Sequence, residues 1–289
     1  IEALLTRGTP LRLGRLPLSR SETARVPVRD YRAGPPPAWP TEAELASRAL
    51  GGRVPALPQR RRSVLRVRVR AMDLRLVQIP LLCEHYRADT ISGAEAVIDR
   101  WLVDGALSHR QRLGIHSGEL GDATVVLMPR SAEERLRGTS RGAVVVGLGE
   151  MGALGAEGVT EAVRAGALRY LLHASDRYGE DHCDGRGRQP DTAIPLRLAS
   201  LLVGSNSAAS LDVGEAVKAV VRGVLLANRD YAQCAKARRG PVGRIVELEL
   251  IELYRDAAIS AAHAVSALDK SLAAELERLG ARLDLSEPL

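Results

Sequence analysis

The chain has 289 residues, of which 45% are hydrophobic, 26% charged and only 3% aromatic, with no Phe. The abundance of periodic Ala, Val, Ile and Leu excludes a wholly disordered chain. No apolar run approaches the ~18 residues of a membrane span, and the first residues lack the continuous apolar stretch of a secretory signal. The three cysteines, Cys83, Cys183 and Cys234, show neither a disulfide framework nor zinc-ligand spacing, so we expect a cytoplasmic protein.

The net charge of +6 is unevenly distributed. Residues 1–70 carry 15 Lys and Arg against 5 Asp and Glu, whereas the remainder carries 26 against 30. The high isoelectric point therefore describes an N-terminal arm. A polyanion is one partner for such an arm, either nucleic acid or a membrane surface. Aromatic residues for base stacking are scarce there, so an arginine-rich linker is the favoured interpretation and nucleic acid the less favoured partner.

The chain order predicts three parts: a Pro- and Arg-rich linker over 1–62, an α/β domain over 63–280 and a tail over 281–289. The linker contains the extended segment Ala33–Pro40 and a short helix over 41–50. From Val64 an alternation of apolar residues and arginines (Arg66, Arg68, Arg70) predicts a half-exposed strand, whose charges would also protect a sheet edge. The later elements are expected as strands over 75–82, 122–129, 142–150, 194–204 and 243–253, helices over 92–102, 157–173, 211–228 and 255–279, and a polar loop over 178–191.

Strands separated by helices of ten or more residues require parallel neighbours joined by right-handed crossovers. We therefore expect a three-layer α/β sandwich with a mostly parallel sheet over about 64–280, preceded by the basic arm.

Two glycine turns are the candidate ligand site. Gly147–Gly152 fits the G-x-G-x-x-G pattern after a strand, and Gly204, Ser205 and Asn206 follow the next strand. Ligands in open α/β sheets bind outside the carboxyl ends of strands, so a crevice shared by Gly147, Leu148, Gly149 and the second turn would accept an anionic small molecule. Glu150 argues against a dinucleotide ligand, because its carboxylate would repel a pyrophosphate. The alternative to a ligand site is that these glycines simply form tight turns.

Other titratable residues give weaker signals. His116 lies in a glycine-rich turn near Glu119, and Glu95 and Asp99 share one helix face. His182 and Cys183 are adjacent in the polar loop, where neighbouring carboxylates would raise the thiol pKa, the wrong direction for a nucleophile. We expect no catalytic residue, no metal site and no cofactor.

Two resemblances to known families follow from longer segments. Gly142–Ala174 resembles the N-terminal domain of leucine aminopeptidases, in which a strand ends in V-G-L-G before an alanine-rich helix. This resemblance implies a macro-domain-like α/β fold without the aminopeptidase metal site. Ile79–Leu127, Leu201–Asn206 and Leu248–Val265 look like the region that precedes CHAT domains, which are caspase-like proteases, in large bacterial proteins.

No catalytic residue of either family can be matched to this chain. The resemblance therefore implies a non-catalytic, regulatory companion domain of a bacterial CHAT-type protein, with the adjacent protease domain as its partner. The alternative function is binding of a nucleotide or another anionic small ligand at the glycine turns, with hydrolysis as a further option.

Overall fold

The computed structural model describes residues 62–116, 118–129, 140–152, 154–181, 193–205, 211–235 and 242–285. All described residues belong to one compact unit, Arg60–Leu289. The expected extended segment Ala33–Pro40 and the helix over 41–50 lie outside the described residues. Among the described helices, none is long and apolar enough to cross a membrane.

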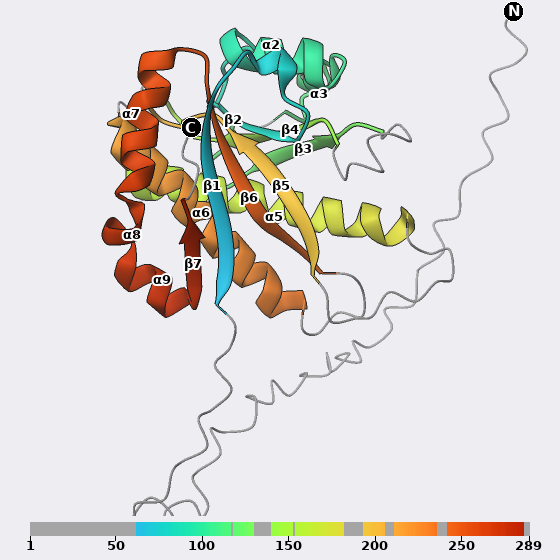
Figure 1. Ribbon diagram of the computed structural model, residues 1–289. Helices are drawn as coiled ribbons and strands as arrows, with labels where there is room; N and C mark the ends of the chain where they lie inside the picture. The colour runs from blue at the N-terminus through green and yellow to red at the C-terminus, as the bar shows by residue number, and fades with distance from the viewer. Residues whose placement is uncertain are drawn as a thin grey trace, which may run out of the picture. The chain divides into compact units, whose positions relative to one another are not determined.

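Seven strands form one sheet in the order β3-β4-β2-β5-β6-β1-β7 (Figure 1). Every neighbouring pair is parallel except β3 and β4, which are antiparallel. The mostly parallel sheet is therefore confirmed. The strands are β1 (Ser63–Ala71), β2 (Leu81–His85), β3 (Ala123–Leu127), β4 (Gly142–Gly147), β5 (Ile194–Ser200), β6 (Gly243–Glu252) and β7 (Ala281–Asp284).

Helices cover the two faces of the sheet unequally (Figure 1). The larger hydrophobic cluster joins one face to α5 (Ala156–Asp181), α6 (Val213–Ala235), α7 (Arg255–Ser266), α8 (Leu268–Ser271) and α9 (Ala273–Leu279). A smaller cluster joins the other face of β2 and β4 to η1 (Leu74–Leu76), α2 (Gly93–Leu102) and α3 (Ala106–Arg112). Because both faces of β4 are covered, all six of its residues are buried and apolar or glycine. This arrangement is the expected three-layer sandwich.

The long helices α5 and α6 pack closely because a glycine lies where they meet. A Cβ atom at Gly223 of α6 would lie 2.8 Å from the Thr160 carbonyl oxygen and 2.8 Å from the Val163 Cβ of α5. The start of α6 is fixed by Asp212, whose Oδ1 accepts a hydrogen bond of 2.9 Å from the Glu215 N–H. Asp212 therefore serves as the N-cap of α6.

Several predicted elements differ in the structure. The strand expected over 75–82 is wrong: Asp73 caps the 3₁₀ turn η1, and β2 begins only at Leu81, after Pro80. The chain also forms α3, which was not expected, and α5 continues through residues 178–181, where a loop was expected. The first four residues of the expected tail form β7, which pairs with β1.

The single helix expected over 255–279 is three helices. At the end of α7 the Ser266 hydroxyl donates to the His263 carbonyl at 2.7 Å, and at the end of α8 the Ser271 hydroxyl donates to the Leu268 carbonyl at 3.3 Å. Serine hydroxyls that compete for main-chain carbonyls favour such interruptions. Apolar residues of all three helices belong to the larger hydrophobic cluster.

The prediction that the arginines of β1 protect a sheet edge is wrong. β1 is an interior strand, because β6 and β7 flank it. Arg66 pairs with Asp284 at 3.0 Å, Arg68 with Glu247 at 3.4 Å, and Arg70 with Glu249 at 3.2 Å. These cross-strand ion pairs compensate charges on a sheet face that no described helix covers in this region (Figure 1).

Candidate metal centre at the carboxyl end of β2

The carboxyl end of β2 is the switch point of the sheet. β2 lies between β4 and β5, and the chain leaves β2 toward α2 on one face but leaves β4 and β5 toward α5 and α6 on the other. Connections that leave neighbouring strands toward opposite faces open a crevice between them. A ligand site is therefore expected beside the last residues of β2.

Three buried side chains meet at this point. The Glu95 carboxylate lies between two imidazoles: its Oε2 is 2.8 Å from His85 Nδ1, and its Oε1 is 2.8 Å from His116 Nε2. The centroids of the two rings are 4.5 Å apart. His85 and Glu95 are 4% and 7% exposed, and the His116 side chain is 0% exposed, so bulk water does not hydrate the cluster.

Each member comes from a different element. His85 is the last residue of β2, Glu95 lies in the first turn of α2, and His116 follows α3. The loop after His116 passes so close to β4 that a Cβ atom at Gly147 would lie 2.1 Å from the Glu119 carbonyl oxygen. The first glycine of the G-x-G-x-x-G pattern thus permits the approach that brings His116 to Glu95.

The electrostatics of the cluster favour an ionised Glu95. Burial by itself would raise the pKa of the Glu95 carboxyl, but the hydrogen bonds from His116 and His85 outweigh it, and the net effect lowers the pKa. One atom of the cluster stays unsatisfied: the buried His116 Nδ1 has no hydrogen-bond partner among the described residues. Since buried polar atoms are normally paired, the cluster is not complete as a hydrogen-bond network alone.

A cavity of about 370 Å³ adjoins the cluster. It is lined by His85 and by three carboxylates, Glu84, Asp89 and Glu95, with no Lys or Arg among the described lining residues. Burial raises the pKa of Glu84, although its Oε2 accepts a hydrogen bond of 2.7 Å from the Gly204 N–H. Burial also raises the pKa of the Cys83 thiol well above its usual value, which disfavours the thiolate form that a nucleophile needs. Because its described lining holds three carboxylates and no Lys or Arg, the cavity favours a cation as its ligand.

The predicted glycine turns lie at these strand ends, but their amides already have protein acceptors. The N–H groups of Gly147, Leu148 and Gly149 donate to the carbonyls of residues 122, 85 and 118 at 3.0, 3.0 and 2.7 Å. The Gly204 N–H donates to Glu84, and the Ser205 N–H donates to the Leu202 carbonyl at 3.1 Å. Asn206 lies outside the described residues. Anion binding by these turns stays a prediction. None of these five N–H groups is free to donate a hydrogen bond to an anion.

The other sequence candidates are separated from one another. Glu119, expected beside His116, instead pairs with Arg87 at 3.1 Å. Asp99 points to the next helix, where its Oδ1 accepts the Leu107 N–H at 2.7 Å. His182 and Cys183 lie outside the described residues. His85 was not among the residues predicted from the sequence, although its position at the end of a buried strand was a signal that could have revealed it.

No protein-family model and no curated protein sequence matches the chain. Solved structures of similar fold include the bottromycin maturation enzyme BotP, with 17% identity over 66% of this chain and a TM-score of 0.33. They also include a mutant of tomato leucine aminopeptidase, with 12% identity over 70% of this chain and a TM-score of 0.42. A mutant Oceanobacillus iheyensis macrodomain with ADPR has 9% identity over 74% of this chain and a TM-score of 0.42.

The matched regions cover 32% of the BotP chain, 36% of the aminopeptidase chain and 97% of the macrodomain chain. The chain thus spans about a third of the length of the two enzymes. Macrodomains and a leucine aminopeptidase are the resemblances that the sequence suggested, and both recur here at low identity. We transfer no ligand and no activity from these proteins.

Proposed function

We propose that this chain binds a divalent transition-metal ion through His85, Glu95 and His116, and that the ion holds a small ligand in the adjoining cavity. The observation that carries the proposal is the convergence of two imidazole nitrogens and one carboxylate oxygen, all within 4.8 Å of one another, in a buried site. The metal would lie between the two ring nitrogens and the Glu95 carboxylate, which now contact one another directly.

The donor set indicates the type of metal. Two imidazoles and one carboxylate suit Zn²⁺ and neighbouring transition ions, whereas Mg²⁺ and Ca²⁺ prefer oxygen ligands alone. Three protein ligands leave a coordination position open, as in catalytic rather than structural zinc sites. His85 and Glu95 also line the cavity, so a small ligand there can reach that position.

The charges of the cavity support the same conclusion. Without a metal, the carboxylates of the cavity give it negative potential and repel an anion, with Glu84 contributing least because burial raises its pKa. A bound divalent ion would offset most of this negative charge and present a local positive charge at its open coordination position, where an anionic ligand at these strand ends could bind. Anionic small-molecule binding here, the alternative function suggested by the sequence, therefore depends on the metal in our proposal.

The test is metal binding to the purified full-length chain. After dialysis against EDTA and then against buffer, isothermal titration with Zn²⁺ should show one ion per chain, and Co²⁺ should give the visible absorption of a four-coordinate site. The His116→Gln variant should lower Zn²⁺ affinity by tenfold or more, since it removes one ligand.

The matched control is His109→Gln, which removes an exposed histidine of α3 outside the cluster. It should bind Zn²⁺ as tightly as the wild type. If wild-type protein takes up no stoichiometric Zn²⁺ or Co²⁺, or if both variants weaken binding equally, the proposal is wrong, and the cluster is then a structural hydrogen-bond network.

The companion role beside a CHAT-type protease is a separate proposal that rests on the sequence resemblance. It concerns the partner of the domain and not the metal. Its test is whether the chain changes the peptidase activity of such a protease when the two are joined or mixed. An unchanged activity would remove this role and leave the metal proposal standing.

A further inference from the structure

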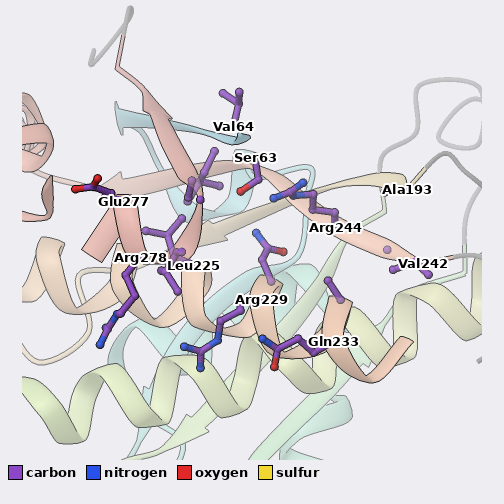
Figure 2. Close-up of a pocket in the computed structure, with 17 residues that line it drawn as sticks. Ser63, Val64, Ala193, Leu225, Arg229, Gln233, Val242, Arg244, Glu277 and Arg278 are labelled. Atoms are coloured by element: carbon purple, nitrogen blue, oxygen red, sulfur yellow. The ribbon is translucent and has the colours of Figure 1, made fainter. Parts of the chain in front are cut away.

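A second cavity lies at the opposite end of the sheet, where the parallel strands begin (Figure 2). It has a volume of about 570 Å³. The first residues of three strands line it, Ser63 of β1, Gly243 of β6 and Ala281 of β7, together with residues of α6 and α9. It is distinct from the cluster at the carboxyl end of β2, with which it shares no lining residue.

Arg244 is the cation that this cavity leaves uncompensated. It is half-buried on β6, lines the cavity, and has no carboxylate partner among the described residues. Burial lowers the pKa of its guanidinium, which reflects a charge held partly away from water. In Figure 2 the side chain extends from β6 toward Ser63. Because such a charge is costly unless paired, the position favours an anion.

The other arginines of the cavity differ from Arg244 in this respect. Arg229 pairs with Asp230 at 2.6 Å, and Arg278 pairs with Glu275 at 3.0 Å. Asn228 is also occupied, since it exchanges two hydrogen bonds with the main chain of Ile245 at 2.8 and 3.0 Å. Glu277 of α9 also lines the cavity, but in Figure 2 it lies on the far side from Arg244. The uncompensated guanidinium therefore lies at the β6 end of the cavity, where Asn228 holds the start of β6 in place.

The remaining wall of the cavity has an apolar part beside the polar residues Ser63, Gln233 and Glu277. Its apolar side chains come from β1, α6, α9 and the residue before β6: Val64, Leu65, Leu225, Val242 and Leu279. Val64 is 38% exposed although it is a large aliphatic residue on a strand. We propose that this cavity binds a small monocarboxylate with an aliphatic body, whose carboxylate pairs with Arg244 and whose chain covers this apolar wall. One guanidinium fits one carboxylate, and the apolar wall excludes ligands that are charged throughout.

The test uses octanoate as the probe and isothermal titration of the full-length chain as the measurement. Octanoate should bind, octylamine should not, and acetate should bind at least tenfold more weakly because it lacks the aliphatic chain. Arg244→Gln should weaken octanoate binding about tenfold or more, since it removes a charge-assisted pair. Arg112→Gln, on the exposed surface of α3, makes the same change in net charge and should bind octanoate as the wild type does.

A second variant tests the proposal even if Arg244→Gln does not fold. Gln233→Glu adds a negative charge to an exposed residue of α6 that lines the cavity, and it should weaken octanoate binding without a change in β6. Equal binding of octanoate and octylamine, undiminished binding to both cavity variants, or tighter binding of inorganic phosphate than of octanoate would overturn the proposal. Octanoate binding should persist after EDTA treatment. A failure of octanoate to bind can therefore be distinguished from a failure of the chain to bind metal.

Discussion

Glu95 is the residue on which the cluster at the carboxyl end of β2 depends, because both histidines contact its carboxylate. The pKa of this carboxyl is lowered in the folded chain relative to its usual value of 4.5. A carboxyl whose folded pKa is depressed stabilises the protein above its unfolded pKa and loses that contribution as the pH falls through the folded pKa. The cluster therefore makes the fold sensitive to acid even without metal.

This sensitivity can be measured on metal-free protein. The Glu95→Gln variant should be less stable than the wild type by about 1–3 kcal/mol at pH 7, since the amide cannot accept a hydrogen bond from both histidines without loss. The difference should shrink as the pH is lowered below about 4.5. Urea unfolding of both proteins at pH values from 7 to about 3.5 gives the two free energies. A difference that stays constant across this range would contradict the assignment of an ionised Glu95.

At the same scale, the sequence allowed only part of the cluster to be predicted. His116 and Glu95 were both singled out, but each was assigned a different neighbour. Glu119 was nearer in sequence to His116, whereas the real partner lies 21 residues away. Only the course of the chain through α2, α3 and the close approach at Gly147 brings the two together. Spacing along one element cannot reveal a pair that the tertiary fold makes.

At the scale of elements, the contact between α5 and α6 rests on Gly223. Gly223→Ala should destabilise the protein by about 1–3 kcal/mol, although alanine is the better helix former, because the new methyl group would overlap the Thr160 carbonyl and Val163. The control is Gly155→Ala, where the added Cβ meets nothing within 4 Å. Thermal and urea unfolding should separate the two variants. Equal stability of both would show that α6 can shift without cost.

Strongly periodic elements were predictable from sequence, and short or interrupted ones were not. β4 is apolar throughout, β6 alternates aliphatic and charged residues, and α6 has one apolar face, so the sequence made each of these elements identifiable. β7 has only four residues, and it is a strand because β1 lies beside it. The antiparallel direction of β3 also has no signature in its own residues, since alternation of side chains is the same in either direction.

At the scale of the whole molecule, the charge is divided between the N-terminal arm and the rest of the chain. A fragment from Ser63 to Leu289 should fold with a melting temperature within about 2 °C of that of the full chain, because the described core begins with β1. The full chain, with twelve arginines in residues 1–62, should bind heparin more tightly than the fragment, and increasing salt should weaken that binding steeply. Equal heparin binding by both proteins would show that the arm is not the polyanion-binding segment.

The position of β1 has a consequence for biosynthesis. β1 is the first described strand, yet its two neighbours, β6 and β7, are the last strands of the sheet. During translation β1 must therefore wait for about 180 further residues before β6 becomes available to pair with it. Until then its three alternating valine and leucine side chains have no partner strand. The arginines between them carry like charges, which disfavour pairing of this unpartnered strand with another copy of itself.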